Sequence, residues 1–152
     1  MRILMICTGN TCRSPMAEAL MRRALKTYHL AGISVQSAGV HAPEGAQASA
    51  EAVREMKRRG LDISQHRAHR LTPEMLEGAL ALCMTSQHLE TVRRIAPDCD
   101  ADTLTRRAGL PGGDILDPIG GGQPAYHLAA EQIDRSVRRI AEQLAASAEN
   151  RR

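Results

Sequence analysis

The stretch Cys-Thr-Gly-Asn-Thr-Cys-Arg-Ser-Pro at residues 7–15 gathers side chains that can carry out nucleophilic chemistry. A cysteine reacts as its thiolate, and positive surroundings favour that form of the thiol. The planar guanidinium of Arg13 can bind two oxygens of a tetrahedral oxyanion. Ser14 can stabilise Cys7 as a leaving thiolate when a covalent intermediate breaks down. The spacing therefore predicts attack by Cys7 on a phosphoryl group that Arg13 holds.

The backbone of the same stretch is suited to holding an anion. Gly9 allows a tight turn, and Asn10 tolerates a left-handed conformation. A short loop that leads into a helix can direct several N–H groups at one anion, and the helix dipole adds to the attraction. The residues that we expect to bind the substrate in this way are Thr8, Gly9, Asn10, Thr11, Cys12 and Ser14.

Strand and helix patterns alternate along the chain that must position this loop. The predicted strands cover residues 2–6, 33–40, 79–85 and 102–105, and the predicted helices begin near residues 14, 49, 72, 86 and 124. Ser14 is expected to be the N-cap of the first helix, with Pro15 as its first helical residue. A loop rich in Gly and Pro is expected over residues 106–123.

This alternation predicts an α/β fold, namely a doubly wound, four-stranded parallel sheet of Rossmann-like or flavodoxin-like type with helices on both faces. Residues 1–152 are expected to form a single domain, with about 146–152 as a frayed tail. In open sheets of this kind ligands bind beyond the carboxyl ends of the strands, where the Cys7 loop is expected to lie.

The composition excludes several classes of protein. Apolar residues make up 43% of the chain, but it has no Phe or Trp and two Tyr, and its net charge is only +3. No basic stripe alternates with aromatic residues, so we expect no nucleic-acid partner. No apolar run reaches membrane length or the length of a signal peptide's apolar region, so we expect a cytoplasmic protein. The four cysteines show no zinc-binding spacing, and no metal or organic cofactor is implied.

The pattern Cys-x5-Arg-Ser at residues 7–14 resembles that of the low-molecular-weight protein tyrosine phosphatase family. Further motifs that follow in the family's order are SAG at 37–39, HRA at 66–68, CMT at 83–85 and DPIGG at 117–121. The resemblance implies a protein phosphatase that forms a phosphocysteine intermediate. It further implies that Cys7 is the nucleophile, Arg13 the phosphate clamp and Asp117, in a mobile Gly-rich loop, the general acid.

The same resemblance implies supporting roles for other residues. Asn10, Ser37 and His66 occupy the positions at which the family has a hydrogen-bond network that shapes the loop. Cys12 occupies the position at which the family can form a reversible, redox-sensitive disulfide with the nucleophile Cys7.

Two departures from the tyrosine-specific pattern favour phosphoarginine as the substrate. Ile119, Gly120 and Gly121 follow Asp-Pro, where tyrosine phosphatases of this family carry aromatic residues. Thr11 replaces a bulkier aliphatic residue, and this loop resembles that of the bacterial protein arginine phosphatases. We expect hydrolysis of phosphoarginine in protein substrates by a monomer, with a protein arginine kinase as functional opponent. Protein tyrosine phosphatase activity is the alternative.

Two further functions fit the loop less well. An arsenate reductase needs two more cysteines close together to relay a disulfide, whereas Cys83 and Cys99 are separated by a predicted helix and position 90 is Glu. A non-catalytic module that binds phosphorylated proteins would not need the nucleophile or the acid, and this chain has both.

Overall fold

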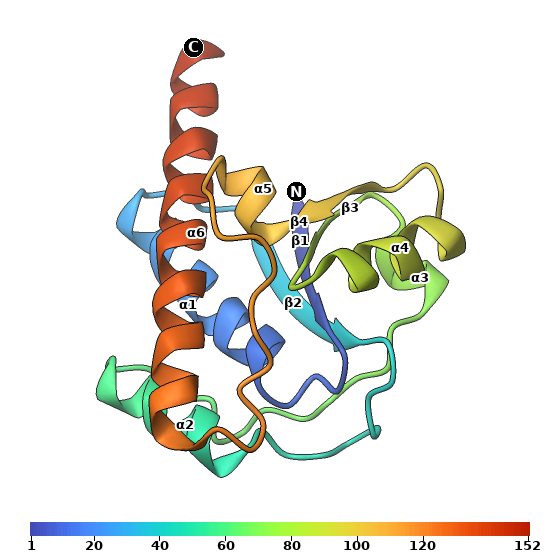
Figure 1. Ribbon diagram of the computed structural model, residues 1–152. Helices are drawn as coiled ribbons and strands as arrows, with labels where there is room; N and C mark the ends of the chain where they lie inside the picture. Colours follow the sequence, from blue (N-terminus) through green and yellow to red (C-terminus); the bar gives the residue numbers. More distant parts are fainter.

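Strand β1 (Arg2–Cys7) is an inner strand of the sheet, and five of its six residues are buried. In the computed structural model, which describes residues 1–152, it pairs in parallel with β2 (Ser34–Gly39) and with β3 (Ala79–Cys83). Strand β4 (Asp100–Thr103) extends the sheet beside β3, giving the order β2-β1-β3-β4 (Figure 1). This arrangement confirms the predicted four-stranded, doubly wound parallel sheet.

Alternate residues of β1 enter two separate apolar clusters because successive side chains of a strand point to opposite faces. Ile3, Met5 and Cys7 belong to the larger cluster, and Leu4 and Ile6 belong to the smaller one. The helices that cover the larger cluster are α1 (Arg13–Thr27), α2 (Ala50–Arg58), α5 (Leu104–Ala108) and α6 (Gly122–Asn150). The helices that cover the smaller cluster are α3 (Pro73–Leu76) and α4 (Ser86–Ile95).

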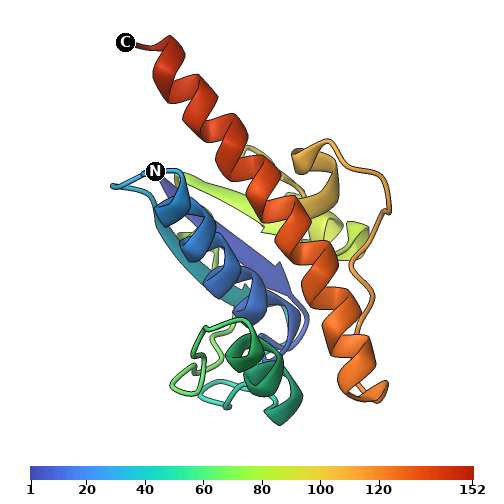
Figure 2. The ribbon, with the colours of Figure 1, turned by 90° about the vertical axis from the view of Figure 1, so that its left-hand side faces the viewer.

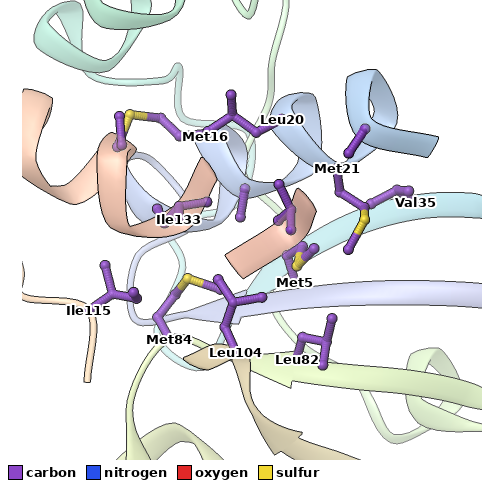
Figure 3. Packing of buried hydrophobic residues seen from close by; sticks show 14 of the residues in the cluster. Met5, Met16, Leu20, Met21, Val35, Leu82, Met84, Leu104, Ile115 and Ile133 are labelled. Atoms are coloured by element: carbon purple, nitrogen blue, oxygen red, sulfur yellow. The ribbon is translucent and has the colours of Figure 1, made fainter. Parts of the chain in front are cut away.

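The larger cluster is filled by aliphatic and methionine side chains, as a chain without Phe or Trp requires. Met5 and Leu82 of the sheet face Met16 and Leu20 of α1 and Ile133 of α6 (Figure 3). The flexible methionine side chains adapt to the spaces that rings would otherwise fill. Helix α6 crosses this face obliquely beside α1, and its C-terminal end projects beyond the sheet (Figure 2).

Two local predictions are wrong. Helix α1 begins at Arg13 with Cys12 as its N-cap, so Ser14 already lies inside the helix; its hydroxyl contacts Cys7 and Asn10 instead of capping. Helix α5 was not predicted. It forms because the Thr103 hydroxyl accepts a hydrogen bond from the Arg106 N–H and ends β4 with a helix cap.

The last residues of α6 are exposed to solvent. The helix continues to Asn150, and every residue from 146 onward is exposed. The frayed tail stays a prediction. None of the helices combines the length and the apolar character that crossing a bilayer requires.

Candidate active site

The segment that joins β1 to α1 has its carbonyl groups turned outward. Backbone N–H groups of the segment after β2 donate to Cys7 O and Thr8 O at 3.0 and 2.9 Å, and Ser49 N donates to Thr11 O at 2.9 Å. Asn10 has a left-handed φ of 55°, as predicted, whereas Gly9 has no positive φ. With these carbonyls bonded outside the loop, the amide of Asn10 faces inward and donates to Cys7 Sγ at 3.3 Å.

A chain of three hydrogen bonds ends at the Cys7 sulfur. His69 N donates to Asn10 Oδ1 at 2.8 Å, which leaves the Asn10 side-chain N–H to donate to Ser14 Oγ at 2.7 Å. Since the Ser14 oxygen accepts this bond, its own proton is available to Cys7 Sγ, 2.8 Å away. The Ser14 hydroxyl and the Asn10 N–H are thus both directed at the Cys7 sulfur.

The predicted supporting residues do not all reach the loop. His66 does, because its Nε2 lies 2.7 Å from Asn10 O. Ser37 does not, because its hydroxyl donates to Glu18 Oε1 at 2.7 Å. Ser37 pairs in register with Met5, two positions before the end of β1, so its side chain meets α1 below the level of the loop.

Arg13 connects the loop to the segment that carries Asp117. Its guanidinium is buried, donates from Nη1 to Ile115 O at 2.9 Å, and has Nη2 3.8 Å from Asp117 Oδ2. The Asp117 side chain is half exposed and accepts a bond from Ile119 N at 3.1 Å. The structure thus brings Cys7, Arg13 and Asp117 to one edge of the sheet.

Two contacts anchor the segment between α5 and α6, which runs past α6 to the loop end of the sheet (Figure 1). Ile115 is fully buried, and its N–H donates to Met84 O at 2.8 Å, just after β3. Asp114 Oδ1 accepts from Ser86 N at 2.9 Å at the start of α4. Asp114 therefore holds the segment in place, whereas the carboxylate of Asp117 is left exposed beside Arg13.

Cys12 is a buried free thiol whose sulfur lies 3.3 Å from the Tyr126 hydroxyl and 3.5 Å from Ser49 Oγ. Burial, and then the bond with Cys12, raises the pKa of Tyr126 to about 12. Cys7 is also a free thiol, so the disulfide between Cys7 and Cys12 stays a prediction. Beside these groups, Thr11 and Ile119 line an open pocket of about 560 Å³.

His88 also belongs to this edge, a position that was not predicted from the sequence. Its Nε2 lies 2.8 Å from Thr8 Oγ1, and the residue is 5% exposed. Burial, and then the charge of Arg13, lowers the pKa of His88 to about 4. The signal was available, because His88 follows β3 closely and the carboxyl ends of β1 and β3 meet at the same edge.

The remaining cysteines lie on the other side of the sheet. Cys7 belongs to the larger apolar cluster, whereas Cys83 belongs to the smaller one and Cys99 packs against it. Burial raises the pKa of Cys83 to about 12 and also raises that of Cys99. Thiols of this kind are poor partners for disulfide exchange with Cys7.

Comparison with known proteins identifies the family of this chain. The family described as low molecular weight phosphotyrosine protein phosphatase matches residues 2–150. A protein-arginine-phosphatase of Geobacillus stearothermophilus is 40% identical over 146 residues, which cover 94% of this chain and 95% of the relative. A probable low molecular weight protein-tyrosine-phosphatase, EpsP of Ralstonia nicotianae, is 38% identical over 89% of this chain and 90% of its own.

A solved structure shows the same fold. It is a cysteine-to-serine variant of the arginine phosphatase YwlE with a phosphorylated active-site serine. Its TM-score to this chain is 0.89, with 35% identity and coverage of 95% of both chains.

Proposed function

The chain belongs to the low molecular weight phosphotyrosine protein phosphatase family, and we propose that it hydrolyses phosphoarginine in proteins through a phosphocysteine intermediate. The observation that carries the chemistry is the position of the Cys7 sulfur, which has two hydrogen-bond donors directed at it within a loop whose carbonyls face outward. The observation that favours arginine is the pairing of a polar Thr11 with an Ile119 that offers no ring.

In the first step the Cys7 thiolate attacks phosphorus and forms a P–S bond while the P–N bond to the guanidine breaks. Inward amide groups and the guanidinium of Arg13 stabilise the charge on the phosphoryl oxygens. Asp117 gives its proton to the leaving nitrogen. Its carboxyl group is half exposed and lies 3.8 Å from Arg13, so it can reach the guanidine of a substrate that enters the site from solvent.

In the second step Asp117, now a carboxylate, takes a proton from a water molecule whose oxygen attacks phosphorus. The P–S bond breaks, phosphate is released, and the electron pair returns to the Cys7 sulfur. The Ser14 hydroxyl donates a hydrogen bond to the departing thiolate, in the direction that the bond from Asn10 imposes. The enzyme is then ready for another cycle without any cofactor.

The preference for arginine follows from the surroundings of the entrance. Phosphoarginine has a planar, polar leaving group that needs hydrogen-bond acceptors, whereas phosphotyrosine needs an apolar or aromatic contact for its ring. Thr11 is half buried and supplies a hydroxyl, and the only ring in the adjoining pocket, Tyr126, is itself buried. A site that hydrogen-bonds its substrate discriminates more strongly than an apolar one.

The test is a side-by-side measurement of kcat/KM on peptides of one sequence that contain phosphoarginine or phosphotyrosine. We expect the phosphoarginine peptide to be preferred by roughly 100-fold or more. Preference for the phosphotyrosine peptide would make the chain a tyrosine phosphatase and reject the arginine proposal.

The non-catalytic alternative is tested at the sulfur. Cys7→Ser should retain binding of a phosphoarginine peptide and lose phosphate release, because the serine hydroxyl is a poorer nucleophile than a thiolate. Phosphate release at the wild-type rate would show that Cys7 is not the nucleophile. Arsenate reduction would require Cys83 or Cys99 to exchange with Cys7 across the sheet, which their high pKa values oppose.

We further propose substrates, an opposing enzyme, a cellular compartment and an oligomeric state for this protein. Phosphorylated proteins are its substrates, and a protein arginine kinase is the activity that it opposes. A reactive thiolate needs a reducing compartment, which supports a location in the cytoplasm. Cys7, Ser14, Arg13 and Asp117 already meet within a single chain, so the proposed chemistry needs no residue from a partner, and we propose that the enzyme acts as a monomer.

A further inference from the structure

His88 bridges the loop after β1 and the start of α4. Its Nε2 lies 2.8 Å from Thr8 Oγ1, and its Nδ1 lies 3.0 Å from Thr85 Oγ1. Thr85 is the N-cap of α4, and its hydroxyl oxygen accepts the backbone N–H of His88 at 3.2 Å. A buried ring with both nitrogens bonded is a fixed element, and one of its two partners is the residue directly after Cys7.

The partners of the two ring nitrogens and their exposure indicate which nitrogen carries the proton. The Thr85 oxygen already accepts a bond, so its hydroxyl proton is available for Nδ1 of His88. The ring proton then lies on Nε2 and is donated to Thr8 Oγ1. Either tautomer leaves one threonine proton without a protein acceptor. Thr8 is exposed whereas Thr85 is half buried, so the unbonded proton is assigned to Thr8, where solvent or a ligand can accept it. The low pKa of His88, about 4, keeps the ring neutral at physiological pH, so that one ring nitrogen donates and the other accepts.

Thr8 is thereby held from two sides. Its carbonyl oxygen accepts from His41 N at 2.9 Å, and its hydroxyl oxygen accepts from His88. The residue is exposed at the edge of the sheet where Cys7 and Arg13 lie. Since the Thr8 oxygen accepts from the ring, its own proton has no acceptor within the protein and is available to a ligand.

We propose that His88 is a positioning residue that holds Thr8 so that the Thr8 hydroxyl donates a hydrogen bond to the phosphoryl group of the substrate. The proposal rests on the phosphatase function but not on the choice between arginine and tyrosine. It gives the site a side-chain donor in addition to Arg13 and the backbone amides.

The first measurement is the affinity for inorganic phosphate by titration calorimetry, which needs no turnover. Thr8→Val removes the hydroxyl with little change of shape, and we expect phosphate to bind roughly 10-fold more weakly. Thr8→Ser keeps the hydroxyl and should stay within about threefold of the wild type. Equal phosphate affinity in Thr8→Val and the wild type would overturn the proposal.

The second measurement tests whether His88 acts on phosphate binding through Thr8. His88→Ala should weaken phosphate binding as much as Thr8→Val does, and His88→Gln should restore most of the loss because its amide N–H can reach Thr8. The double variant Thr8→Val/His88→Ala should be no worse than either single variant in kcat/KM for p-nitrophenyl phosphate. Losses that multiply would show that His88 acts independently of Thr8 and would reject its positioning role.

Two controls separate this role from stability. Gln87→Ala changes an exposed neighbour of His88 and should leave phosphate affinity and kcat/KM unchanged. If His88→Ala does not fold, the comparison of Thr8→Val with Thr8→Ser still decides whether the hydroxyl binds phosphate. A protein that binds phosphate as described but hydrolyses no phosphate ester would contradict the proposed function while supporting the role of Thr8.

Discussion

The side-chain amide of Asn10 donates to the hydroxyl oxygen of Ser14 at 2.7 Å, and this bond decides where the Ser14 proton points. With its oxygen occupied, the hydroxyl is left to donate to the Cys7 sulfur 2.8 Å away. The orientation of the amide is fixed in turn by His69 N, which bonds to its oxygen. The direction of the hydrogen bond to the Cys7 sulfur therefore depends on the backbone of His69, which is distant in sequence from the loop.

Ser14→Ala should slow the breakdown of the phosphocysteine more than its formation. A hydrogen bond to a charged group contributes about 1.5–3 kcal/mol, which corresponds to a roughly 10- to 100-fold lower kcat. Rapid-quench kinetics should show a burst of dephosphorylated product followed by a slow phase. Ser147→Ala, an exposed position on α6, is the control. A uniform slowing without a burst would contradict the assignment.

Asp117→Asn should reduce turnover in proportion to how much the leaving group needs a proton. General acid catalysis contributes about 10²- to 10⁴-fold, so a loss of this size is expected on phosphoarginine peptides. The loss should be smaller on p-nitrophenyl phosphate, whose leaving group is stable as an anion. Equal losses on both substrates would show that Asp117 does not act as the acid.

Thr11→Ile should move the enzyme toward phosphotyrosine. The substitution replaces a hydroxyl at the entrance pocket with an aliphatic group beside Ile119. We expect the ratio of kcat/KM for phosphoarginine over phosphotyrosine peptides to fall roughly 10-fold or more. An unchanged ratio would show that Thr11 does not determine specificity.

Gly39→Ala should distort the loop between Cys7 and Ser14, although Gly39 itself lies on the neighbouring strand β2. An added Cβ at Gly39 would lie 2.5 Å from Thr8 O and 2.9 Å from Asn10 N, and both are backbone atoms of the loop. Overpacking of this kind costs about 1–3 kcal/mol, which a denaturant titration can measure together with the loss of activity. Gly9→Ala is the steric control for stability, because its Cβ would meet only Thr11 Oγ1 at 3.6 Å. Equal stability of the two variants would contradict this account.

His88 should make folding stability fall as the solution becomes acidic. Its pKa is about 4 in the folded protein, below the usual value of 6.5, so only the unfolded chain gains a proton between these pH values. The contribution is absent above pH 6.5 and amounts to roughly 3 kcal/mol of destabilisation by pH 4. Arg13, Asp114 and Asp117 are the charged groups that act on the ring.

Denaturant titrations of the wild type and His88→Gln at pH 7 and pH 4.5 measure this term, because all other titrating groups are shared. The stability advantage of the wild type over the variant should shrink by about 2–3 kcal/mol at the lower pH. An advantage that does not change with pH would show that His88 titrates normally.

The amino-acid sequence by itself determined the elements and the residues within the loop. Helix α4 begins at Ser86 as predicted, and α2 begins at Ala50, one residue after the predicted start near residue 49. The loop from Cys7 to Ser14 was recognisable because a nucleophile, a guanidinium and a hydroxyl lie within one strand-to-helix turn. Such features are local, so residue type, spacing and period are enough to find them.

The tertiary structure alone decided which distant groups meet the loop. His88 contacts Thr8 from 80 positions away, and the Ile115 carbonyl holds Arg13 from 102 positions away. Ser37 does not join the hydrogen-bond network of the loop, because its register in β2 places it beside Met5, before the end of β1, where its hydroxyl bonds to Glu18. These contacts depend on strand order, on register and on the direction of each side chain at the sheet edge, which local sequence patterns do not specify.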